Sequence, residues 1–137
     1  MKVLVDTSIW SLTLRRGTSK EHELVRELSE LIGEVRVQII GPIRQELLSG
    51  IKSQKQFREL KSYLSAFPDL PLETRDFEKA AEFFNINREN GIQGSNTDFL
   101  ICSAAYNRNL EIFTTDKDFD NFRKYIPIKL YSPRADA

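Results

Sequence analysis

Residues 1–8 read Met1-Lys-Val-Leu-Val-Asp6-Thr7-Ser8, a short β-rich run that ends at a carboxylate. The run Lys2–Val5 is typical of a buried strand, and the residues Thr7–Arg15 that follow it suit a helix. A strand that passes directly into a helix is a basic unit of α/β proteins. This stretch therefore indicates the fold class, and the rest of the chain agrees with it.

The remaining sequence alternates in the same way and contains no internal repeat or low-complexity tract. We expect further helices over Lys20–Ile32, Ile43–Ser49, Gln54–Ala66, Thr74–Asn90, Thr97–Asn107 and Asp116–Tyr125, and further strands over Val35–Ile40, Leu70–Glu73, Glu111–Thr114 and Ile128–Tyr131. Such alternation implies a parallel sheet. The sequence thus predicts a single α/β domain over residues 1–137, with a parallel sheet of about five strands covered by helices on both faces.

The composition is that of an ordinary globular domain, with 40% hydrophobic and 29% charged residues among 137. Twenty acidic residues balance twenty basic ones, so the formal charge of zero gives no sign of a nucleic-acid partner, and any basic surface must be local. No apolar stretch approaches the ~20 residues needed to cross a bilayer, and no signal-peptide core is present. We therefore expect a cytoplasmic protein without membrane association.

The chain has one cysteine and one histidine. Cys102 cannot form an internal disulfide, and the apolar stretch Phe99–Ala105 around it predicts a buried structural thiol. His22 lies among charged residues at the start of a helix, so we expect it on the surface. A Ser-His-Asp or Cys-His catalytic set is excluded, and so is a metal site rich in histidine or thiolate.

Two acidic residues follow expected strands directly. Asp6 ends the first strand, and Asp116 comes just after the strand Glu111–Thr114. In parallel α/β sheets ligands bind beyond the carboxyl ends of the strands, which is where these two residues would lie. Each also has a purely structural interpretation, Asp6 as a helix N-cap and Asp116 as a turn or cap residue.

Two further acidic residues fall on apolar helical faces. Glu46 shares a face with Ile43 and Leu47, and Asp98 shares one with Ile101. Burying an acid in an apolar stripe is costly unless it meets a cation. The structural alternatives are a stripe-edge residue that reaches solvent for Glu46 and a helix-capping residue for Asp98.

Together these four residues are more informative than each alone. Asp6, Glu46, Asp98 and Asp116 are all expected at one rim of the sheet, where like charges repel unless a cation lies among them. Oxygen-only ligands select Mg²⁺ or Mn²⁺. A cation held in this way suits phosphodiester hydrolysis, because it activates water and neutralises charge on the phosphate oxygens. The sequence therefore predicts a metal-dependent hydrolytic centre at this rim.

The same residues resemble the PIN-domain family, and within it the VapC-type toxins of bacterial and archaeal toxin–antitoxin pairs. The resemblance spans essentially the whole chain. It is carried by four fragments in a fixed order: Val5-Asp6-Thr7-Ser8, Pro42-x-x-x-Glu46-Leu-Leu-x-Gly50, Asn96-Thr-Asp98 and Thr115-Asp116-Lys-Asp118-Phe119.

This resemblance implies a metal-dependent endoribonuclease that acts on RNA, is often a homodimer, and is held inactive by a cognate antitoxin. It implies that Asp6 and Asp98 are the principal ligands of Mg²⁺ or Mn²⁺, and that Glu46 and Asp116 complete the acidic pocket.

The resemblance also implies supporting residues around the pocket. Thr7 or Ser8 and Thr115 would orient the carboxylates through hydrogen bonds. Asp118 would either contact a metal or anchor the final helix. The residues that contact RNA phosphates are not defined by it. Loose candidates from their charge are Arg15, Arg16, Arg44 and Lys52.

Several alternatives remain. A receiver domain would need an acidic pair near Asp6, and a haloacid-dehalogenase-like phosphatase would need Asp at position 8, but residues 7 and 8 are Thr and Ser. A PIN nuclease for RNA processing or decay, and a catalytically inert protein-binding PIN module, fit the same fold. Trp10 and Tyr63 are expected in the core, with a dimer or antitoxin surface as the alternative.

Overall fold

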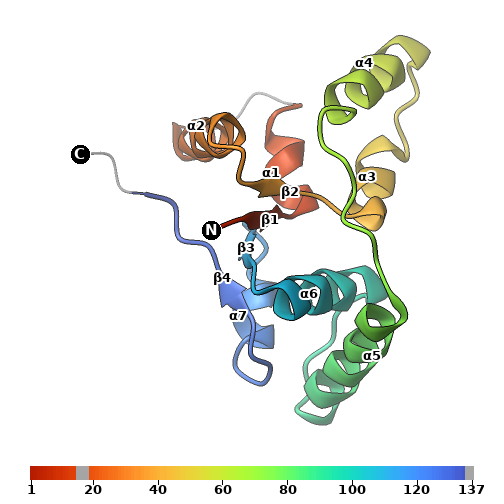
Figure 1. The fold of residues 1–137 in the computed structure, drawn as a ribbon, viewed down its shortest axis with the longest axis vertical. Helices are drawn as coiled ribbons and strands as arrows, with labels where there is room; N and C mark the ends of the chain where they lie inside the picture. The colour runs from red at the N-terminus through yellow and green to blue at the C-terminus, as the bar shows by residue number, and fades with distance from the viewer. Residues whose placement is uncertain (15–18, 135–137) are drawn as a thin grey trace.

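A parallel four-stranded sheet forms the centre of the protein in a computed structural model, which describes residues 1–14 and 19–134. The strand order is β2-β1-β3-β4 (Figure 1), with bounds Val37–Gln38, Val3–Val5, Glu111–Phe113 and Lys129–Leu130. Val3 pairs with Val37 on one side and with Glu111 on the other, and every pairing is parallel. The carboxyl ends of all four strands therefore lie at one edge of the sheet.

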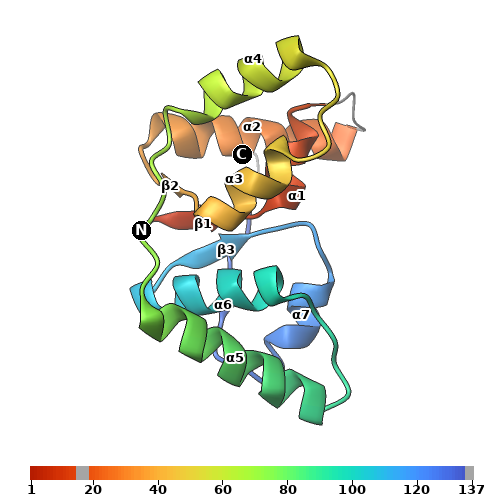
Figure 2. The same cartoon turned by 90° about the vertical axis from the view of Figure 1, so that its right-hand side faces the viewer.

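Seven helices within the described residues pack around this sheet. The sheet lies between α2 and α4, toward one end of the molecule, and α5 and α6, toward the other (Figure 2). The helices span Thr7–Leu12 (α1), Ser19–Gly33 (α2), Gly41–Leu48 (α3), Gln54–Leu64 (α4), Thr74–Glu89 (α5), Asn96–Arg108 (α6) and Asp118–Phe122 (α7). The expected α/β class with a parallel sheet is confirmed. No helix of the described part is long and apolar enough to cross a membrane.

The main departure from the expected elements is the segment Leu70–Glu73, which is not a strand. Only a single bridge joins Ile39 and Asp69, supported by a hydrogen bond from the Leu70 N–H to the Ile39 carbonyl at 2.9 Å. Pro71 lacks an N–H group, so the ladder cannot continue along this segment.

Several other elements are also shorter than expected, β2 and the last helix among them. β2 covers Val37–Gln38 instead of Val35–Ile40, because Val35 has a left-handed φ of 56° that ends the preceding helical turn. The last helix begins at Asp118 and not at Asp116, since Asp116 belongs to the turn before it.

The core contains the strands β1 and β3 and the apolar sides of the helices. Trp10 is 1% exposed and donates from Nε1 to the Val5 carbonyl at 3.1 Å, so it is a core residue as expected. Tyr63 contacts Trp10 edge to face but is 44% exposed, so it is not a core residue. Cys102 is fully buried and His22 is exposed, which confirms both expectations.

A buried ion pair fixes α5 against α6. Asp76 at the start of α5 is fully buried, and both of its oxygens accept from the Arg108 guanidinium at 2.8 Å. Asn107 and the Glu73 N–H donate to the same carboxylate, each at 2.8 Å. The Arg108 hydrogen bonds hold the pKa of Asp76 well below its usual range, although burial acts in the opposite direction. Because α6 carries Asp98 at its other end, this pair also positions the candidate site.

We expect Arg108→Ala to lower the free energy of unfolding by about 3 kcal/mol, because it leaves a buried carboxylate without its cation. The pKa of Asp76 is lower in the folded protein than in the unfolded chain, so the ionised carboxylate stabilises the fold at pH values above its unfolded pKa. This stabilisation is lost as the pH falls through the lower folded-state pKa. Urea unfolding of parent and variant should therefore differ at pH 7, and the difference should begin to shrink only as the pH falls below about 4.

The control is Arg88→Ala, which removes an exposed arginine of α5 and should change the unfolding free energy by less than about 0.5 kcal/mol. Equal effects of the two substitutions would show that the ion pair does not hold the helices together.

Candidate active site

The first acidic residue of the site is Asp6, at the carboxyl end of β1. Its N–H donates to the Phe113 carbonyl of β3 at 2.9 Å, so the backbone is fixed by the sheet. Its side chain is only 6% exposed and forms the N-cap of α1. Oδ2 accepts from the hydroxyl groups of Ser8 at 2.8 Å and Thr114 at 2.7 Å. The capping interpretation of Asp6 is thus correct, and it leaves Oδ1 without a hydrogen bond from the described residues.

Thr114 connects the ends of β1 and β3. Its hydroxyl donates to Asp6, accepts from the Asp116 N–H at 3.0 Å, and lies 3.2 Å from the Ser8 hydroxyl. The Thr115 N–H in turn donates to the Ser8 hydroxyl at 3.0 Å. Thr115 is expected to orient a carboxylate through a hydrogen bond, but only its backbone N–H takes part, by donating to Ser8, whereas the Thr114 hydroxyl donates to Asp6 directly. The sequence contains one signal for this role, because Thr114 lies at the very end of a strand, two residues before Asp116.

Asp116 is half-buried in the turn between β3 and α7. Its Oδ1 accepts from the Asp118 N–H at 2.9 Å, which is the turn geometry that the structural interpretation of this residue required. Asp118 is exposed and begins α7. In the structure Asp118 anchors the start of this helix through its backbone.

Asp98 lies in the first turn of α6 and forms a reciprocal capping box with Ser95. Its Oδ2 accepts from the Ser95 N–H at 3.0 Å, and its own N–H donates to the Ser95 hydroxyl at 3.0 Å. Gly94 precedes this box, and a Cβ atom there would lie 2.6 Å from the Phe122 ring. The close approach of α7 therefore requires glycine at this position. Oδ1 of Asp98 accepts no hydrogen bond from the described residues.

Glu46 is exposed on α3, at the edge of the apolar stripe formed by buried Ile43 and Leu47. Its Oε2 accepts from the Thr7 hydroxyl at 3.4 Å, and the Thr97 side chain also hydrogen-bonds to it. Thr7 and Thr97 flank Asp6 and Asp98 in the sequence, so these contacts hold Glu46 next to the other acidic residues.

Electrostatic coupling shows that the four acidic residues share one region. The pKa of Glu46 is raised by partial burial and then by the charges of Asp6 and Asp98. The pKa of Asp98 is raised, chiefly by burial, and the charges of Asp116 and Asp6 add to this increase while Ser95 opposes it. The buried thiol of Cys102 has its pKa raised well above the usual range by burial, and then by Asp98 and Asp6. The carboxylates thus repel one another at the carboxyl edge of the sheet.

The donor chemistry of this region fits a hard divalent cation. In Asp6, Asp98 and Asp116 one oxygen is fixed by hydrogen bonds while the other accepts none from the described residues. Within residues 1–14 and 19–134, no three carboxylate, imidazole or thiol groups are close enough to hold one ion as they stand. The free oxygens, the mutual repulsion and the absence of nitrogen or sulfur ligands nevertheless suit Mg²⁺ or Mn²⁺.

Of the two described candidates for phosphate contacts, Arg44 and Lys52, only Lys52 remains a candidate. Arg44 donates to Asp69 at 3.0 Å and to the carbonyls of Leu64 and Phe67, so its guanidinium connects α3 to the segment after α4. Its role is structural. Lys52 is exposed and makes no ion pair with the described residues. Arg15 and Arg16 lie outside the described residues.

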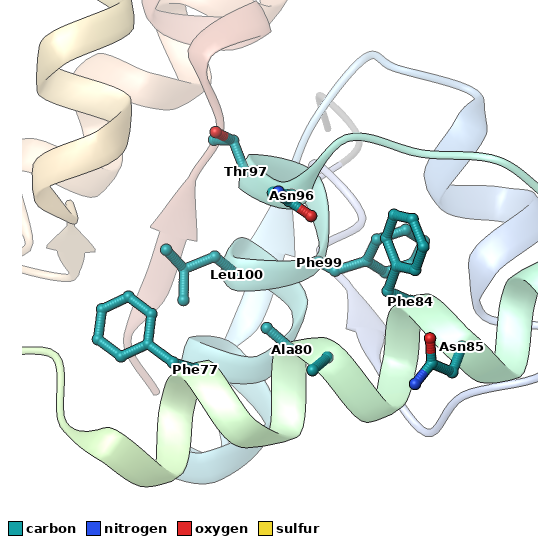
Figure 3. A pocket seen from close by; sticks show the side chains of 9 residues that line it. Phe77, Ala80, Phe84, Asn85, Asn96, Thr97, Phe99 and Leu100 are labelled. Atoms are coloured by element: carbon teal, nitrogen blue, oxygen red, sulfur yellow. The ribbon is translucent and has the colours of Figure 1, made fainter.

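Three hollows lie near these elements. One of about 410 Å³ adjoins Glu46, between α1, α3 and the start of α6. A second of about 370 Å³ lies between α5 and α6, where Phe77, Phe84 and Leu100 form an apolar wall below Asn96 and Thr97 (Figure 3). Thr97 lines both of them. A third of about 670 Å³ is formed by α2 and α4 and the residues that follow α1 and α3.

Comparison with known protein families assigns residues 3–125 to the PIN domain. The chain belongs to the PIN domain family. The resemblance inferred from the four sequence fragments is therefore confirmed, and the matched residues cover most of the chain. Comparison with curated proteins gave no match.

Solved structures with a similar fold include a toxin–antitoxin complex from Klebsiella pneumoniae, with a TM-score of 0.64 and 22% identity over 86% of this chain and 90% of that one. FitAcB from Neisseria gonorrhoeae matches with a TM-score of 0.76 and 22% identity over 96% of this chain and 97% of that one. VapBC2 from Rickettsia felis, bound to a DNA fragment from its promoter, matches with a TM-score of 0.74 and 18% identity over 96% and 98%. VapBC-1 from nontypeable Haemophilus influenzae matches with a TM-score of 0.72 and 16% identity over 96% and 97%. At these identities the likeness shows the fold.

The crowding of the carboxylates predicts the effect of Asp98→Asn on stability. Because the pKa of Asp98 is raised in the folded protein, its ionised form opposes folding at neutral pH, and this cost disappears as the pH falls. We expect the variant to be at least as stable as the parent at pH 7. The difference should shrink as the pH approaches about 4, where the carboxyl group is protonated in the unfolded chain.

Urea unfolding at both pH values measures this effect. Asp120→Asn is the matched control, because Asp120 is an exposed acid of α7 paired with Arg123 at 3.3 Å. A clear loss of stability in Asp98→Asn at pH 7, beyond that of the control, would show that repulsion at the site is not the dominant effect.

Proposed function

We propose that this PIN domain is a metal-dependent endoribonuclease and the toxin of a VapBC-type toxin–antitoxin pair. The observation that carries the proposal is the gathering of Asp6, Glu46, Asp98 and Asp116 at the carboxyl edge of the sheet, with raised pKa values at Glu46 and Asp98. PIN domains are generally nucleases, and structures of similar fold include a toxin–antitoxin complex. Both facts support the proposal.

In this proposal Asp6 and Asp98 are the principal ligands of Mg²⁺ or Mn²⁺, and Glu46 and Asp116 complete the acidic pocket. When bound, such a cation lowers the pKa of water and offsets the charge that develops on the phosphate oxygens. The protein contributes orientation. Thr114 and Ser8 donate their hydroxyl hydrogens to Oδ2 of Asp6, and Oδ1 stays available to the cation.

The partners belong to the same proposal. We propose that the chain forms a homodimer, for which light scattering in solution is the direct test. We also propose that a cognate antitoxin occupies the hollow between α2, α4 and the residues after α1. Leu14 and Tyr63 line this hollow and are 53% and 44% exposed, so they present neighbouring apolar surface that a partner would cover.

Cleavage of total cellular RNA tests the chemistry. The purified protein should cut RNA with Mn²⁺ or Mg²⁺ and stop with EDTA, leaving 5′-phosphate and 3′-hydroxyl ends because water, and not the ribose 2′-hydroxyl, is the proposed nucleophile. Asp98→Asn should lower the rate on the order of 100-fold, which corresponds to about 3 kcal/mol of lost transition-state stabilisation. Asp120→Asn should keep the parental rate.

Cyclic-phosphate ends, or full activity of Asp98→Asn in EDTA, would overturn the mechanism. No cleavage by the parent chain under any metal condition would favour an inert protein-binding PIN module. The small protein encoded by a neighbouring gene can be co-expressed with the chain. If it does not inhibit cleavage, an RNA-processing or decay nuclease would be favoured.

The hydrogen-bond network around Asp6 makes a separate prediction. Thr114→Val keeps the shape of the side chain but removes the hydroxyl that orients Asp6 and receives the Asp116 N–H. We expect Mn²⁺ affinity, measured by titration calorimetry, to fall by about 10- to 100-fold. Thr115→Val should have a much smaller effect, since only the backbone of Thr115 takes part. An equal loss in the two variants would contradict the role given to Thr114.

A further inference from the structure

The cavity beside Glu46 is not explained by the binding of a cation. Its volume of about 410 Å³ falls within the range of roughly 300–1,000 Å³ that is typical of small-ligand sites. It opens next to the acidic residues, because Thr7 directly follows Asp6 and Thr97 directly precedes Asp98. The full lining is Thr7, Pro42, Gln45, Glu46, Ser49 and Thr97.

The charge of this lining does not suit the phosphate group of a nucleotide. Glu46 is the only ionisable residue among the six, and no lysine or arginine lines the cavity. The lining offers no cationic side chain to a phosphate group, which in the proposed function lies at the cation among the acidic residues instead. The cavity therefore suits an uncharged polar group that lies next to a phosphate.

The hydrogen-bonding groups of the lining suit the edge of a nucleobase. The Ser49 hydroxyl donates to the Gln45 carbonyl at 2.6 Å and keeps its own acceptor capacity. The Gln45 side chain is exposed and makes no hydrogen bond to the described residues. An amide offers both donors and an acceptor, which is the pattern that single-stranded bases present on their Watson–Crick edges. Pro42 adds an apolar surface for the flat face of a base.

We infer that this cavity binds the base of the nucleotide that flanks the cleaved phosphate, and that the Gln45 amide selects which base enters. The inference rests on the proposed ribonuclease function and names a determinant of its cleavage sequence. Gln45 precedes Glu46 on α3, so a base that contacts Gln45 places its own phosphate near the acidic residues.

The test uses a pool of single-stranded RNA oligonucleotides with randomised sequence, cut by the full-length protein in Mn²⁺ and sequenced at the new ends. The parent should prefer particular bases at one position beside the cut. Gln45→Ala should reduce that preference about five- to tenfold, with the loss confined to kcat/KM for the preferred base. Gln45→Glu removes the amide donors and should shift the preference toward bases that donate. Gln54→Ala, which alters an exposed glutamine of α4, should keep the parental preference.

The outcomes separate this inference from the function on which it rests. Cleavage with an unchanged base preference in both Gln45 variants overturns the inference and leaves the ribonuclease intact. A rate loss that is equal for every sequence also overturns it, since Gln45 would then not select a base. Failure of the parent chain to cut any RNA overturns the proposed function and this inference with it.

Discussion

The hydrogen bonds that hold the buried Asp6 carboxylate are the constraint on which the rest of the site depends. Asp6 is 6% exposed, and burying a carboxylate is costly unless hydrogen-bond donors compensate for the lost water. The donors to Oδ2 are the hydroxyls of Ser8, in α1, and Thr114, at the end of β3. Oδ2 accepts both hydrogen bonds only when β1 and β3 are paired, so the acidic pocket depends on the sheet. These donors are neutral, so the charge of Asp6 remains available to a cation.

Structural and functional interpretations of the acidic residues turn out to be compatible. Asp6 caps α1, Asp98 completes the capping box of α6, and Asp116 closes the turn before α7. Each uses a single oxygen for this purpose. A cap or turn fixes the carboxylate in one orientation, and a fixed carboxylate loses little freedom when its other oxygen binds a ligand.

The repulsion among these carboxylates requires the surrounding elements to resist it. The buried pair of Asp76 and Arg108 holds α5 and α6 together, and the rings of Phe99 and Phe122, with centroids 4.7 Å apart, pack α7 against the start of α6. Arg44 connects α3 to the segment after α4 through Asp69 and two carbonyls. Arg108 and Arg44 thus act within the scaffold and do not neutralise the acidic site.

The sequence by itself determined the fold class and the family, and it predicted the four acidic residues of the proposed site. These follow from local patterns, because strand ends, helical stripes and short motifs are visible within a few residues of one another. Only the tertiary structure decided which hydroxyl orients Asp6, because Thr114 and Asp6 are 108 residues apart and meet through strand pairing. It also decided that Arg44 is structural, that Leu70–Glu73 forms only a bridge, and that a polar cavity adjoins Glu46. Each of these depends on contacts between distant segments, which residue spacing along the chain does not encode.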